Sequence, residues 1–286
     1  MRLAVIIAVL LSAAGPAVAG PASGAVKSAT GTISPKFAVA YVVRDSEHPR
    51  QTVVEILLTE TAVDPAPLRE ALDPHVTAIN LPGLNDRNYL LLWVGANGSV
   101  SMNATYSKTM TQYVNDSSGG LKGEFTTNTP AKIDGRIYAP APLKTMDGPT
   151  YTIDVKFSAD VMPALTGTPL PAGGAEPGKA FMAFLDAITK KNWAGIKAGL
   201  SPKILPGFDR SYNTPAENLS SAVDILSAQL PISKAKVTGG FLVSPSVAVI
   251  EFQGERFGTA WVEIARMEKT GAAWQYVESA PVGMIR

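Results

Sequence analysis

Residues 37–159 contain short runs of β-branched and aromatic residues separated by turn-forming residues. This pattern predicts β-strands at 37–44, 52–59, 89–94, 100–107, 121–128, 131–139 and 150–159. Asn97-Gly98 lies between two of these runs and favours a hairpin, because both residues tolerate a positive φ. One helix is predicted at DPAPLREAL, with Asp64 as its cap and Pro65 at its first position. Short strands with regular turns indicate an antiparallel β-sandwich-like domain over residues 31–162.

The spacing of apolar residues changes near residue 178 from a period of two to the helical period of about 3.6. A helix is predicted from an apolar stripe made of Phe181, Phe184, Leu185 and Ile188. A later helix is predicted to begin with a capping box, in which Thr214 is the N-cap, Pro215 follows and Glu217 is the third helical residue. Its apolar stripe is Leu219, Val223, Leu226 and Leu230.

Four antiparallel strands are predicted after these helices, at 235–243, 246–253, 259–268 and 272–279. Helices followed by such strands form an α+β fold, which we expect over residues 178–286. Residues 163–177 interleave proline with glycine and predict a linker between the two domains. The polar residues 20–30 predict a flexible lead.

The N-terminal residues have the pattern of a cleavable secretory signal over residues 1–19. Arg2 precedes an apolar run from Leu3 to Leu11, which is shorter than the roughly 20 residues of a membrane helix, and Ala17-Val18-Ala19 fits the cleavage site. We therefore expect an exported, periplasmic or extracellular protein, of bacterial origin, without a transmembrane segment in the mature chain. The absence of cysteine excludes disulfides and a lipid anchor on cysteine.

The charge balance bears on the class of partner. The chain has 25 basic and 24 acidic residues, so loss of Arg2 with the signal leaves 24 of each and a net charge of zero. A nucleic-acid-binding protein needs a basic surface, so we expect no nucleic-acid partner.

The segment AFMAFLDAITKKNWAGIKAGLS, followed by a helix and four strands, resembles the nuclear transport factor 2-like, or cystatin-like, superfamily over residues 176–286. The resemblance implies a curved sheet wrapped around the long helix, forming a cone whose mouth often holds a ligand. It also implies that some members are isomerases or dehydratases with an Asp or His and a Tyr in the cone. The versions that depend on histidine do not apply, because no histidine follows His75.

The last two predicted strands carry the candidate binding site. Alternation places Trp261 and Glu263, with Ala265 and Met267, on one face of the first strand, and Trp274, Tyr276 and Glu278 on one face of the next. Aromatic rings with a few carboxylates could line a concave ligand site. A carboxylate beside tryptophan rings would have a raised pKa, which suits a general base. In the other interpretation, the rings pack on the helices and the acids face solvent.

Two further groups of polar residues have competing interpretations. Asp186 is either an acid–base partner of Tyr276 or a charge on the helix surface. His48 with Glu47, and His75 with Asp73, could supply four metal ligands only if two loops met. Neither pair has the short spacing of a known metal motif, so we expect no metal and no cofactor.

No nucleophile–base pair or phosphate loop stands out, which favours a non-catalytic module of the bacterial envelope that binds a small molecule or a protein. One alternative is an isomerase or dehydratase with Glu263 or Asp186 as base and Tyr276 as hydrogen-bond donor. A second alternative is a structural component of an envelope assembly.

Overall fold

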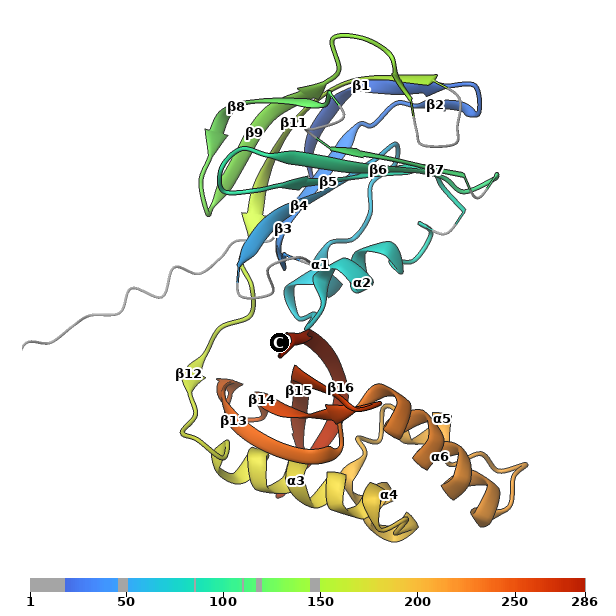
Figure 1. Cartoon of the computed structure of the whole chain (residues 1–286), viewed down its shortest axis with the longest axis vertical. Helices are drawn as coiled ribbons and strands as arrows, with labels where there is room; N and C mark the ends of the chain where they lie inside the picture. Colours follow the sequence, from blue (N-terminus) through green and yellow to red (C-terminus); the bar gives the residue numbers. More distant parts are fainter. Residues whose placement is uncertain are drawn as a thin grey trace, which may run out of the picture.

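The computed structural model describes residues 19–45, 51–84, 86–109, 111–116, 120–144 and 150–285. The expected secretory signal, apart from Ala19, lies outside these residues, as do Glu47 and His48. The described chain is rich in β-structure, with two sheets and a few helices (Figure 1).

The first sheet contains eleven strands within the described residues, and its order is β7-β6-β5-β4-β3-β1-β11-β9-β8, with β2 beside β1 and β10 beside β11. All neighbours are antiparallel except a short parallel pairing of β3 with β11. The strands are β1 (Gly20–Ser28), β2 (Gly31–Ile33), β3 (Phe37–Arg44), β4 (Thr52–Thr59), β5 (Tyr89–Val94), β6 (Val100–Tyr106), β7 (Thr111–Asp116), β8 (Lys122–Asn128), β9 (Lys132–Tyr138), β10 (Leu143–Lys144) and β11 (Thr150–Met162).

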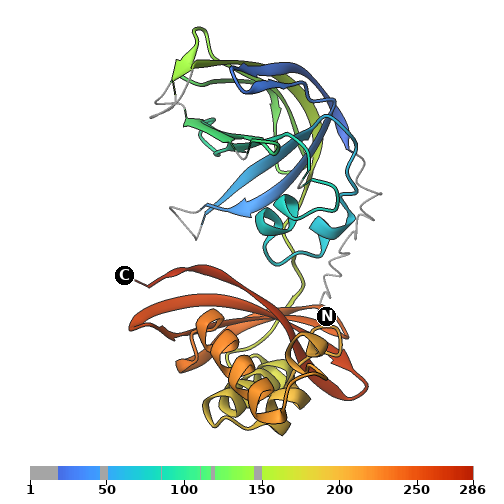
Figure 2. The same ribbon diagram turned by 90° about the vertical axis from the view of Figure 1, so that its right-hand side faces the viewer.

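This sheet curls over its own inner face, as Figure 2 shows. β1 makes the curl possible because it pairs first with β3, through Gly20 and Pro21, and then with β11 through residues 22–28. A Cβ atom on Gly20 would lie 1.8 Å from the carbonyl oxygen of Ser158, so only glycine permits the approach. Residues 20–28 are therefore a paired strand, and the flexible lead predicted from their polar composition is wrong for this stretch.

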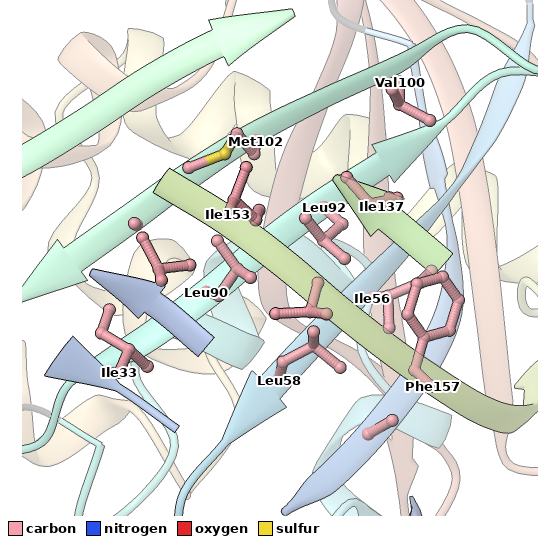
Figure 3. Packing of buried hydrophobic residues seen from close by; sticks show 14 of the residues in the cluster. Ile33, Ile56, Leu58, Leu90, Leu92, Val100, Met102, Ile137, Ile153 and Phe157 are labelled. Carbon is pink, nitrogen blue, oxygen red and sulfur yellow. The ribbon is translucent and has the colours of Figure 1, made fainter. Parts of the chain in front are cut away.

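The curl brings apolar residues of distant strands into one core. Ile56 and Leu58 on β4 and Leu90 and Leu92 on β5 lie in the same cluster as Ile153 of β11 (Figure 3). The opposite face of β3, β4 and β5 is covered by α1 (Ala66–Arg69) and α2 (Pro74–Ile79). Because both faces are covered, these three strands are nearly continuous apolar runs, and their predicted bounds match the structure.

The second sheet has the order β12-β13-β14-β15-β16, and all its neighbours are antiparallel. Its elements are α3 (Ala175–Thr189), α4 (Trp193–Gly199), α5 (Leu205–Phe208), α6 (Pro215–Gln229), β12 (Thr168–Pro169), β13 (Ser233–Ser244), β14 (Val247–Arg256), β15 (Thr259–Thr270) and β16 (Ala273–Met284). The expected linker at 163–177 thus contains β12 and the start of α3, and the sheet has a short fifth strand in addition to the four predicted ones.

The helices lie on the face of the second sheet that is turned away from the first sheet (Figure 2). The predicted stripe of α3 is buried there, with Phe181 against Phe252 of β14 at 4.6 Å between ring centroids. The predicted capping box of α6 is confirmed: the Thr214 side chain accepts from the backbone of Glu217, and the Glu217 carboxylate accepts from the backbone of Thr214.

The opposite face of the second sheet touches the segment between α1 and α2. Leu72 packs with Val249, Ile264 and Ala280 in one apolar cluster. At its edge, Nη1 of Arg266 donates to the carbonyl oxygen of Glu70 at 2.6 Å. Both apolar and polar contacts therefore connect the second sheet to the α1–α2 segment that covers the first sheet.

Candidate functional site

A cavity of about 550 Å³ lies between the end of α6, the α5 segment and strands β14 to β16. Its walls combine five apolar residues with six that carry polar or ionisable groups. Ligand sites likewise join apolar surface with polar groups that fix the orientation of the ligand. The lining residues are Ile204, Phe208, Ala228, Gln229, Arg256, Glu263, Tyr276, Val277, Glu278, Ser279 and Pro281.

Glu263 is the most buried ionisable residue of this cavity, with 1% of its surface exposed. Regular pairing of β14 with β15 places it opposite Phe252, on the face that the helices cover. Its Oε1 atom lies 3.3 Å from Nη1 of Arg256 but has no hydrogen-bond partner among the described residues. Burial raises the pKa of Glu263 to about 7, while Arg256 opposes the shift. A buried carboxyl with an unused acceptor atom therefore faces the cavity.

Arg256 connects β14 to the end of α6. Its Nη1 atom donates to the carbonyl oxygen of Gln229 and, at 3.5 Å, to that of Ala228. The last carbonyl groups of a helix lack partners within the helix and carry partial negative charge, so a guanidinium is favourable there. Gly254 permits the approach, because a Cβ atom there would lie 1.8 Å from the carbonyl oxygen of Pro231.

The Arg256 guanidinium also lies over the Trp261 ring, 4.6 Å from its centroid. Trp261 therefore supports the site through Arg256, although it is not one of the cavity-lining residues. Trp274 packs at the margin of the helix-side core and lies near Lys269, away from the cavity lining.

Tyr276 joins the cavity to the aromatic core of the helical side. Its ring stacks on that of Phe184 with 5.1 Å between centroids, and its hydroxyl donates to Oγ of Ser279 at 3.1 Å. Burial raises the pKa of Tyr276 to about 12, so the phenol stays protonated at neutral pH and can act as a donor.

β16 departs from regular alternation, which corrects the predicted arrangement of its residues. Its pairing with β15 shifts register between Arg266, which is opposite Glu278, and Met267, which is opposite Tyr276. The extra residue of this bulge is Val277, and it places Glu278 on the opposite face from Tyr276. Ser279 takes the position beside Tyr276 that the sequence pattern assigned to Glu278.

Asp186 lies outside the site. It is 57% exposed on the surface of α3 and its carboxylate is 2.8 Å from Nζ of Lys190. The interpretation of Asp186 as an acid–base partner of Tyr276 is therefore wrong, and the surface-charge interpretation applies.

A second polar cluster, on the first sheet, was not predicted. Glu55 of β4 is fully buried and accepts a 2.5 Å hydrogen bond from the Tyr41 hydroxyl. Nδ1 of His75 on α2 lies 2.9 Å from the other carboxylate oxygen of Glu55. The hydrogen bond to Glu55 raises the pKa of His75, although burial opposes the shift. The available signal was a charged residue inside the apolar run TVVEILLT, since a buried charge needs partners.

His75 therefore contacts Glu55 of β4. Across the ranges that the structure describes, no group of three or more His, Asp or Glu residues could hold a metal ion. Nor does any helix in those ranges have the length and apolar character needed to cross a membrane.

Comparison with known proteins gave no match to a family model, to a curated protein or to a solved structure.

Proposed function

We propose that this protein is a non-catalytic binding module of the bacterial envelope and that its cavity holds a small amphipathic molecule. In this proposal, the signal-like N-terminus directs export, and the two sheets belong to a sandwich-like domain and a cone-like α+β domain joined by the segment near residues 163–177. The cone-like α+β assignment is supported by the resemblance to the nuclear transport factor 2-like superfamily, which rests on the order of the helices and strands.

The observation that carries the proposal is the combination of the cavity with the unused acceptor of Glu263. A buried polar atom without a hydrogen bond costs about 1–3 kcal/mol, and a bound molecule that donates to it removes this cost. Apolar side chains such as Phe208 and Pro281 supply the surface that the rest of the molecule would cover. The volume of about 550 Å³ lies within the range typical of small-molecule sites.

The same residues also favour a second candidate, an isomerase or dehydratase. A carboxyl group with a pKa of about 7 can accept a proton near neutral pH, and the Tyr276 phenol is a hydrogen-bond donor lining the same cavity. The enzyme interpretation requires Glu263→Gln to abolish turnover of a bound molecule while it remains bound. The binding interpretation requires no turnover by the natural protein.

A substitution that fills the cavity tests the proposed function directly. Ala228 lines the cavity on the exposed side of α6, so Ala228→Trp adds volume there without entering a packed core. We expect one N-phenyl-1-naphthylamine per chain to bind, with increased fluorescence, and Ala228→Trp to weaken binding about tenfold or more.

Ala216→Trp is the matched control, because Ala216 is exposed on the same helix but does not line the cavity. It should bind the dye as the natural protein does. Equal affinity of the two variants, or no dye binding by the natural protein, would contradict a ligand site in this cavity. Native mass spectrometry of the purified protein would then identify any molecule retained from the cell.

A further inference from the structure

We propose that the molecule bound in this cavity is an amine with an apolar tail, held by its ammonium group at the carboxylate of Glu263. This inference rests on the proposed function and specifies the chemical class of its ligand.

The missing hydrogen bond and the negative charge of the Glu263 carboxylate favour a ligand group that donates hydrogen bonds and carries a positive charge. Oε1 of Glu263 is buried and lacks a hydrogen bond, so it is available as an acceptor. An ammonium group offers only donors, and its positive charge would add to that of Arg256, whose Nη1 atom lies 3.3 Å from Oε1 without a hydrogen bond to it. Hydrogen bonds between ionised partners are roughly twice as strong as those between neutral ones.

The arrangement of Arg256 disfavours an anionic ligand. Its Nη1 atom donates to carbonyl groups at the end of α6, and its guanidinium lies over Trp261. An anion would therefore enter a cavity whose nearest cation is already engaged. It would also meet the carboxyl group of Glu263.

The apolar part of the lining defines the rest of the ligand. Ile204 and Phe208 contribute from the α5 segment, and Val277 and Pro281 from β16. Since these side chains share the cavity with Glu263, a molecule can place its ammonium at the carboxylate and cover them with its tail. Removal of this apolar surface from water adds a favourable contribution to the binding free energy.

Binding of an ammonium should release protons near neutral pH. The ionisable groups that line the cavity beside Glu263 are Arg256 from β14 and Tyr276 from β16, and the helical segments contribute none. Glu278 of β16 also borders the cavity, but the bulge places its side chain on the opposite face of the sheet. Because the pKa of Glu263 is about 7, roughly half of the free protein carries a proton on this carboxyl at pH 7. An ammonium ligand favours the ionised form, so about half a proton should leave per amine bound.

The test compares three molecules with the same tail, n-octylamine, n-octanol and octanoate, as competitors of N-phenyl-1-naphthylamine. We expect n-octylamine to compete about tenfold or more better than either of the others. Glu263→Gln should remove this preference, while Asp186→Asn, which removes an exposed carboxylate outside the cavity, should retain it. Calorimetry in two buffers of different ionisation enthalpy, at pH 7, should show proton release with n-octylamine but not with n-octanol.

The outcomes separate the two proposals. Equal competition by the three molecules, with loss of dye binding in Ala228→Trp, would keep the binding function and overturn the amine. Tighter binding of octanoate would likewise overturn the amine. Absence of dye binding by the natural protein would overturn the proposed function itself. Circular dichroism shows whether Glu263→Gln is folded, and proton release by the natural protein tests the amine without any variant.

Discussion

The Glu263 carboxyl group has surroundings that stabilise its charge poorly. It is almost completely buried, it has one cation at 3.3 Å, and one of its oxygens accepts no hydrogen bond. Its pKa rises from 4.5 to about 7, so folding favours the protonated form. Protonated Glu263 therefore contributes its full share of the folding stability below pH 4.5, the pKa in the unfolded chain. This contribution is lost as the pH rises through about 7, the pKa in the folded protein.

We therefore expect Glu263→Gln to be more stable than the natural protein at pH 8. The neutral amide avoids the cost of the buried charge, which the shift of the Glu263 pKa places at about 3 kcal/mol. At pH 4 the gain should largely disappear, because that pH is below the unfolded pKa of 4.5 and the natural carboxyl is then mostly protonated in both states. Urea unfolding at the two pH values measures the difference. Asp186→Asn, which removes a carboxylate exposed on α3, is the control, and an equal gain of Glu263→Gln at both pH values would contradict the prediction.

Part of this site can be predicted from the sequence of β15 and β16. Glu263 and Tyr276 were identified because strand alternation and side-chain chemistry are visible in the sequence, and both line the cavity. Arg256 and Ala228 were not, because they meet only when the end of α6 is packed against β14. The partners of Glu55 were missed for the same reason, since Tyr41 and His75 lie on separate elements.

Elements with strong local signals were predicted closely. The α6 capping box depends on residues within one turn, so local chemistry is sufficient to identify it. β1 was missed because its Gly, Ala and Ser residues have little strand propensity, and it is a strand because β3 and β11 pair with it. The bulge at Val277 was also missed, since it appears only in the register with β15.

The capping box provides a test at the element scale. Thr214→Ala removes both the cap of the backbone at Glu217 and the hydrogen bond from the Thr214 hydroxyl to the Glu217 carboxylate. We expect the free energy of unfolding to fall by about 1 kcal/mol. Thr214→Ser keeps the hydroxyl and should lose less than half of that amount. Thermal unfolding of the variants measures both effects, and equal losses would show that the hydroxyl is not the stabilising group.

At the scale of the whole molecule, the contact between the two sheets depends on a small apolar cluster around Leu72. Leu72→Asp places a charge against Val249 and Ile264, so the contact should open. Small-angle X-ray scattering should then give a larger radius of gyration. Proteolysis near residues 163–167 should also be faster. Val76→Asp is the control, because Val76 is exposed on α2 and should leave both measurements unchanged.

The position of β1 in the first sheet has a consequence for the kinetics of folding. β1 stands at the N-terminal end of the described chain, yet Ser28 pairs with Tyr151 and Ala22 with Phe157. Pairing of β1 with β11 therefore joins two segments separated by most of the sequence of the first sheet. The chain between them loses conformational entropy when its ends meet, and this cost comes before the pairing stabilises the sheet. Topologies dominated by such distant contacts fold slowly, so during synthesis the edge of β1 that pairs with β11 stays unpaired until β11 has left the ribosome.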